Sequence, residues 1–79
     1  MIKVLFFGPV AERIGKSHES AKFRTGLRLQ DLRDELAAKF PQAFELVCFT
    51  AVNGEHIRDM SVILSDNSEV AFMAKFSGG

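Results

Sequence analysis

Two short, largely apolar segments at opposite ends of the chain constrain its fold more than any other feature. One runs from Ile2 to Phe7, and the other from Val70 to Met73. Segments of this length that are rich in β-branched and aromatic residues and bounded by turn residues are typical of strands. Because apolar side chains occupy consecutive positions, we expect both strands to be central in a sheet and buried on both faces. Such strands are natural neighbours in the middle of one sheet.

One amphipathic helix is predicted between these two strands. Leu29, Leu32, Leu36 and Phe40 recur at spacings of three and four residues, so they form one apolar stripe that suits a sheet surface. Pro41 ends the predicted helix. Its start is less regular, because an arginine stands where a serine or threonine cap is expected. The helix would cover one face of the sheet.

The remaining elements complete a small mixed sheet. The expected elements are a helical turn at 10–14, a hairpin partner at 17–25, strands at 46–52, 56–57 and 69–73, and turns at 53–54 and 65–68. Asn53-Gly54 is the strongest hairpin signal in the chain. Strands on both sides of one helix predict an α+β fold. We expect a β-grasp roll with a mixed sheet of four to five strands and one main helix packed on one face.

Composition limits the function classes. Seventy-nine residues make one domain, and ten basic side chains balance ten acidic ones, which argues against a nucleic-acid partner. No stretch approaches the roughly 20 apolar residues of a membrane span, and the amino terminus lacks the features of a signal peptide. Cys48 is the only cysteine, so an internal disulfide is excluded and a reducing, cytoplasmic location is predicted.

The chain offers no internal catalytic constellation. Gly15-Lys16-Ser17 resembles the end of a phosphate-binding loop, but the glycine that the motif requires five positions earlier is missing. Cys48 lies in an apolar strand and is predicted to pack in the core. His18 and His56 lack the spacing of metal ligands and are predicted to be surface residues. We therefore expect no metal, no bound cofactor and no independent enzymatic activity.

The reactive group is then expected at the end of the chain. Gly78-Gly79 contributes nothing to a core, but a backbone without side chains can enter a narrow active site. The terminal carboxylate, with an ordinary pKa of roughly 3.5, is ionised and unreactive at neutral pH. A partner that uses ATP can activate it as an acyl-adenylate, which a sulfur nucleophile converts to a thiocarboxylate. Two other interpretations remain open: a modifier joined to lysines through Gly79, and an interaction domain whose glycines are accidental.

The residues resemble one known family along essentially the whole chain. The similarity includes the opening Ile2–Phe7 segment, the helix leucines followed by Pro41, Ala51-Val52-Asn53, Glu69–Phe72 and the terminal Gly78-Gly79. Together they resemble the small sulfur-carrying subunits of molybdopterin synthase, which are ubiquitin-like β-grasp proteins. The resemblance implies that residues 1–74 form the domain and that residues 75–79 form a flexible tail.

The resemblance also implies partners and site residues. A ubiquitin-activating-like adenylyltransferase would use ATP on Gly79, a sulfur donor protein would convert the carboxylate, and a large synthase subunit would receive the tail. Phe76, Ser77 and Gly78 would belong to that tail. Phe7, His56 and Met73 match positions where such subunits meet their partners, although a histidine departs from the usual apolar residue. Related carriers serve thiamin, cysteine and other sulfur pathways.

The tail departs from the family pattern as well. The family usually has Pro-Pro-Val before its last three residues, and this chain has Ala74-Lys75-Phe76. Prolines preset an extended tail and lower the entropic cost of ordering it. We therefore expect the partner to supply that order here.

Overall fold

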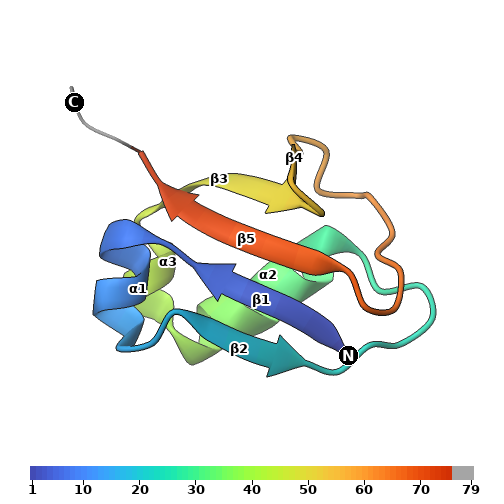
Figure 1. The fold of residues 1–79 in the computed structure, drawn as a ribbon, viewed down its shortest axis with the longest axis horizontal. Coiled ribbons are helices and arrows are strands. Elements are labelled where there is room, and N and C mark those ends of the chain that lie inside the picture. Colours follow the sequence, from blue (N-terminus) through green and yellow to red (C-terminus); the bar gives the residue numbers. More distant parts are fainter. Residues whose placement is uncertain (76–79) are drawn as a thin grey trace.

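A computed structural model describes residues 1–75 of the chain (Figure 1). The elements follow the predicted order, with the helical turn expected at 10–14 present as a short helix and one additional short helix, at 41–44. They are β1 (Ile2–Phe6), α1 (Gly8–Ile14), β2 (His18–Ala21), α2 (Leu29–Lys39), α3 (Pro41–Phe44), β3 (Val47–Val52), β4 (Glu55–His56) and β5 (Glu69–Ala74). No helix within the described residues is both long enough and apolar enough to cross a membrane.

The first and last strands are neighbours in the centre of the sheet. The five strands lie in the order β2-β1-β5-β3-β4 (Figure 1). β1 and β5 run parallel, with Val4 opposite Val70 and Phe6 opposite Phe72, while the other pairs are antiparallel. The helices lie on one side of the sheet, behind the strands in Figure 1. The predicted α+β roll with a mixed sheet is confirmed.

The core lies between one sheet face and α2. Alternate residues of β1 and β5 are buried there, and the α2 leucines pack against them. These core residues are Ile2, Val4, Phe6, Leu29, Leu32, Leu36, Val70, Phe72 and Ala74. The prediction that the two central strands are buried on both faces is wrong. Lys3 is exposed, and Leu5, Ala71 and Met73 are only partly buried, because no helix covers the second face.

The ends of α2 show how this sequence replaces a standard cap. The Asp31 carboxylate accepts a hydrogen bond from the backbone N–H of Arg28 at 3.0 Å, so the first turn is capped without a serine or threonine. The helix ends at Lys39, one residue before the predicted end. Pro41 also begins α3, which the sequence analysis did not predict. Proline suits the first position of a helix because its missing N–H has no partner there.

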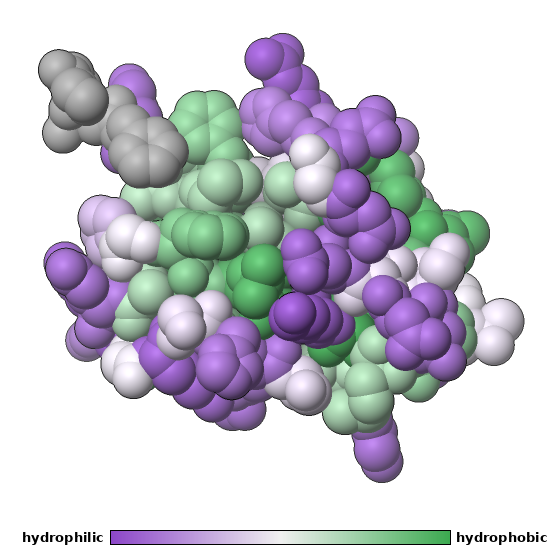
Figure 2. Space-filling model, in the orientation of Figure 1, coloured by the Kyte–Doolittle hydropathy of each residue, from purple (hydrophilic) through white to green (hydrophobic). Residues whose placement is uncertain are grey.

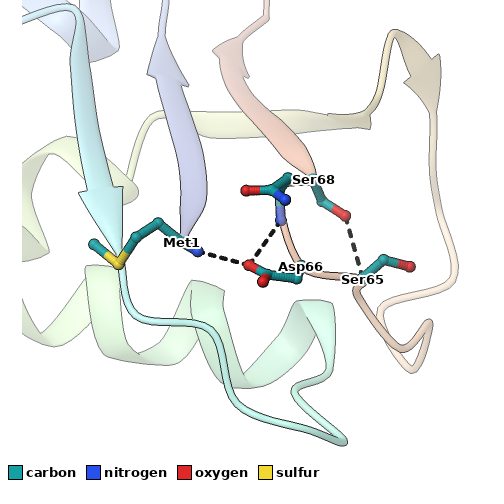
Figure 3. Close-up of polar contacts among 5 residues, drawn as sticks. Met1, Ser65, Asp66 and Ser68 are labelled. Carbon is teal, nitrogen blue, oxygen red and sulfur yellow. Dashed lines mark hydrogen bonds and ion pairs between the residues drawn. The ribbon is translucent and has the colours of Figure 1, made fainter.

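The turns follow the expected residue chemistry. Asn53 and Gly54 adopt φ angles of 51° and 83°, the left-handed pair that a tight hairpin between β3 and β4 requires. Before β5, the Asp66 carboxylate accepts hydrogen bonds from the Met1 ammonium at 2.6 Å and the Asn67 N–H at 3.0 Å (Figure 3). The ammonium lowers the pKa of Asp66. The start of β1 is thus tied to the start of β5.

The prediction that Cys48 packs in the core is wrong, because its side chain is exposed. The register between β3 and β5 shifts between Val47 and Phe49, so Cys48 is the extra residue of a β-bulge. A bulge interrupts the alternation on which the core prediction depended. It also turns Phe49 outward, and 37% of that residue is exposed.

Candidate functional site

The base of the tail lies at one end of a central strand. β5 ends at Ala74, and Lys75 after it is exposed. The predicted tail residues Phe76, Ser77 and Gly78 and the predicted reaction site Gly79 lie outside the described residues. The division into a domain and a flexible tail therefore stays a prediction. The surroundings of Ala74 and Lys75 can still be described.

The parallel pairing of β1 and β5 places Phe7 beside the base of the tail. Because the two strands run parallel, their carboxyl ends lie at the same end of the sheet. The Phe7 N–H donates to the Phe72 carbonyl at 3.3 Å. Phe7 is the last extended residue before α1, and 46% of it is exposed. Phe7 is therefore on the surface and not in the core. It lies one residue from the fully buried Phe6.

β3 brings two further aromatic rings to the same part of the sheet. Phe49 pairs with Met73 across the β3–β5 ladder, so both side chains lie on the face opposite the helices. The ring of His56 lies 5.3 Å from the ring of Phe49, in an edge-to-face arrangement. The structure thus brings Met73 and His56 to one face through Phe49. Phe49 was not predicted as a site residue, since the bulge that exposes it leaves no clear pattern in an apolar segment.

We call this uncovered apolar surface the docking face. Strand register assigns its members to one side of the sheet. They are Leu5, Phe49, Ala51, Ala71 and Met73, with His56 at the border. Phe7 continues β1 in an extended conformation, so alternation with the buried Phe6 places it on the same side. Figure 2 looks onto this side and shows a continuous apolar area bordered by polar residues. A contiguous exposed apolar area with a polar border is typical of a protein interaction site. The predicted partner residues Phe7, His56 and Met73 all lie on or beside it.

The described residues hold no other chemical centre. His18 and His56 are both exposed, as predicted, and the register places them on the two outermost strands of the sheet. Four strand spacings of roughly 4.8 Å separate them, which is too far to share a metal ion. Residues 1–75 contain no group of three or more potential metal ligands.

The charged groups with shifted pKa values belong to structural contacts. Partial burial alone would raise the pKa of Glu19, but hydrogen bonds from Lys16 and Lys39 outweigh it and lower the pKa. The pKa of Asp59 is lowered by hydrogen bonds from the Ser61 hydroxyl and the Ser61 N–H. These carboxylates are held in their ionised form, which suits an ion pair or a turn. None has the raised pKa of a general acid.

Known proteins are similar to this chain in sequence and in fold. The molybdopterin synthase sulfur carrier subunit of Mycobacterium tuberculosis is 32% identical over 81 residues, which cover 99% of this chain and 96% of that protein. One chain of the protein-protein complex of subunits 1 and 2 of the molybdopterin-converting factor from Helicobacter pylori is a similar solved structure. The match has a TM-score of 0.74 and 24% identity, and covers 99% of this chain and 97% of the other.

A second solved structure shares the fold. The small archaeal modifier protein 1 from Methanosarcina acetivorans gives a TM-score of 0.81 at 21% identity, with 99% of this chain and 95% of that chain covered. These likenesses confirm the ubiquitin-like β-grasp fold. The model of the ThiS family matches residues 4–79, nearly the whole chain. This chain belongs to the ThiS family.

Proposed function

We propose that the chain is a sulfur carrier of molybdopterin synthesis, which donates sulfur from a thiocarboxylate at Gly79. The observation that carries the proposal is the position of the base of the tail. β5 lies in the middle of the sheet and ends beside the exposed Phe7, and Phe49 and Met73 pair on the same face. A partner that covers the docking face would therefore receive the tail at the border of the same interface.

The chemistry follows from the state of a terminal carboxylate. At neutral pH it is ionised and a poor acyl donor. In a partner adenylyltransferase, the Gly79 carboxylate attacks the α-phosphorus of ATP and releases pyrophosphate. A persulfide of a donor protein then attacks the acyl carbon and AMP leaves. A donor thiol cleaves the S–S bond of the resulting acyl disulfide, so a disulfide forms on the donor and the thiocarboxylate is released. The thiocarboxylate sulfur then bonds to the acceptor, and water cleaves the acyl–sulfur bond, which leaves the sulfur on the acceptor and restores the Gly79 carboxylate.

The large subunit of molybdopterin synthase is the proposed acceptor of the tail. It would supply the active site and the pyranopterin precursor, while this chain supplies sulfur and no catalytic side chain. Molybdopterin carries a dithiolene group, which contains two sulfur atoms. Each molybdopterin formed would therefore consume two loaded carriers. The complex of subunits 1 and 2 from H. pylori supports this arrangement, because one of its chains shares this fold. All three partners are proposed to meet the chain in the cytoplasm.

Reconstitution tests the proposal directly. Chain loaded with sulfur at its terminus is mixed with the large subunit and the precursor, and molybdopterin is measured. We expect product in proportion to the loaded chain and none from a chain that lacks Gly79. The truncated chain should still unfold at the same denaturant concentration, because no core residue is lost. Equal product from the truncated chain would refute the proposed role of Gly79.

A ubiquitin-like modifier is the second candidate. Its support is the likeness in fold to small archaeal modifier protein 1. The two functions share adenylation and diverge when a lysine amine, rather than sulfur, attacks the acyl-adenylate. A modifier would be found in cells as conjugates of higher mass. A carrier for thiamin or cysteine synthesis would instead be loaded with sulfur but inactive with the large subunit.

A further inference from the structure

The outer edge of β3 is paired over only part of its length (Figure 1). β4 pairs with residues 51–52, and the Ile57 N–H donates to the Thr50 carbonyl at 2.9 Å. Within the described part of the chain, no strand pairs with residues 47–49 on the side away from β5. This half of β3 is therefore an open sheet edge, to which a further strand can be added by backbone hydrogen bonds.

A groove of about 560 Å³ runs along this edge, between β3 and α2. Arg33 of α2 and Arg58 of the segment after β4 line it, and no carboxylate does. Neither guanidinium forms an ion pair with a residue in the range 1–75. The guanidinium carbon of Arg33 lies 5.8 Å from the centre of the Phe44 ring, a contact that positions the charge without neutralising it.

The opposite edge of the sheet provides an internal comparison. A groove of about 200 Å³ lies between β2 and α2, and Glu19 and Glu35 are among its lining residues. There Lys39 binds Glu19 at 3.1 Å, and Arg24 binds Glu35 at 3.4 Å, whereas Lys22, which also lines this groove, forms no ion pair with a residue in the range 1–75. The β2 groove therefore has carboxylates beside its cations, whereas Arg33 and Arg58 line the β3 groove without a carboxylate among the described lining residues.

We propose that the β3 groove binds an extended acidic segment of a partner protein. The segment would add a strand to the open half of β3, and alternate carboxylates would lie beside Arg33 and Arg58. Backbone hydrogen bonds supply affinity in this mode, and alternate side chains supply specificity. A second copy of the chain fits less well, because pairing two β3 edges would bring arginines of the two copies together. The inference does not depend on sulfur transfer.

The test uses the full-length chain and two capped peptides of about six residues, a common strand length. One alternates glutamate with valine, and the other alternates lysine with valine. We expect the acidic peptide to shift the backbone amide NMR signals of residues 47–50 and to slow the alkylation of Cys48 by iodoacetamide. Its affinity should fall as salt rises. Equal binding of the lysine peptide, or signals that shift mainly along β2, would overturn the proposal.

Charge reversal tests the two arginines. Arg33→Glu combined with Arg58→Glu should weaken the acidic peptide about tenfold or more, because two favourable exposed pairs become repulsive. The matched control, Arg13→Glu with Lys22→Glu, changes the net charge equally and should leave the affinity within about twofold. If the Arg33 substitution impairs folding, the single variant Arg58→Glu replaces the double variant, because Arg58 lies outside α2. Unchanged affinity in the folded Arg58→Glu variant would overturn the proposal.

Peptide methylation tests strand addition itself. Two versions of the acidic peptide are N-methylated at alternate amides, one at the odd positions and one at the even positions. In a bound strand only one of these two sets of N–H donors faces β3, so only one version loses its hydrogen bonds to β3. We expect one methylated peptide to lose binding and the other to retain it. Equal binding of both peptides would contradict strand addition, and so would salt-independent dimerisation of the chain through the β3 edge.

Discussion

The two faces of the sheet are built from alternating residues of the same strands, yet they differ in what covers them. Phe6 and Phe72 are almost completely buried under the helices, with 2% and 0% exposed. On the opposite face, 46% of Phe7 and 37% of Phe49 are exposed. Phe6 and Phe7 are adjacent in the sequence, as are Phe72 and Met73. One apolar segment therefore supplies both a core and a surface.

The difference indicates that the two faces have different roles. Burial of the covered face stabilises the fold, in proportion to the apolar area removed from water. The docking face gains nothing comparable in the isolated chain, and exposed apolar area promotes association. Its composition therefore makes sense if a partner covers it. Substitutions on the two faces should separate folding from docking.

The largest effect is expected from Phe72→Ala on the covered face. The Phe72 ring packs against Phe44 at 5.0 Å and Phe6 at 6.5 Å between ring centres, so truncation leaves a cavity at the centre of the core. Such substitutions cost about 3–5 kcal/mol, comparable with the whole stability of a domain this small. Urea denaturation should find this variant largely unfolded.

The neighbouring substitution Met73→Ala is the matched comparison. Met73 is partly exposed, so its truncation should lower the free energy of unfolding by less than about 1 kcal/mol. Equal destabilisation by both substitutions would break the distinction between the two faces.

The next effect concerns docking. Met73→Asp places a charge in the middle of the docking face, and a charge buried without a partner weakens an interface. We expect the affinity for the large synthase subunit to fall by about 2 kcal/mol or more, roughly thirtyfold in Kd. Isothermal titration calorimetry measures this change, and circular dichroism checks that the variant is folded.

Ile63→Asp is the control for that experiment. Ile63 is 62% exposed and lies in the connection before β5, away from the docking face. Adding the same charge there should leave the affinity within about twofold. If both substitutions weaken docking equally, net charge rather than the docking face controls the association.

A smaller effect is expected at the start of α2, on the covered side. Asp31→Ala removes the carboxylate that accepts the Arg28 N–H. The loss of such a cap costs about 1 kcal/mol of stability. Urea denaturation should detect this loss, while calorimetry with the large subunit should find docking unchanged. If the fully folded variant binds the large subunit more weakly than the unchanged chain does, α2 belongs to the interface.

The smallest effect is expected from Asp66→Asn, beside the start of β5 (Figure 3). The folded pKa of Asp66 lies below its unfolded value, so its contribution to stability is complete above the unfolded pKa of about 3.9. It is lost as the pH falls through the lower folded pKa. Thermal unfolding should therefore find the variant slightly less stable at pH 7, and the difference should vanish in strong acid. A difference that persists there would contradict the ion pair.

The sequence predicted the topology well because local signals agreed with one another. The helix stripe, the Asn53-Gly54 turn and two apolar end strands each point to the same roll. The edge at β3 was predicted poorly. A β-bulge shifts the alternation at Cys48, and the sequence carries no clear signal for it. The error placed Cys48 in the core and hid Phe49, the residue that connects Met73 with His56.

The docking face was predictable only in part for a related reason. An apolar strand residue has the same composition whether a helix or a partner covers it, so periodicity does not separate Phe6 from Phe7. The resemblance to sulfur carriers pointed to Phe7, His56 and Met73, and strand register explains why they lie on one side of the sheet. The α3 helix was missed because proline ends one helix and begins the next.

Intact-mass spectrometry of the chain from cells tests the central claim most directly. The account predicts a species in which one oxygen is replaced by sulfur, and fragmentation should localise the sulfur to Gly79. That species should disappear when the adenylyltransferase is absent. A chain found only as the unmodified carboxylate, or only as conjugates to lysines of other proteins, would contradict the account of a sulfur carrier.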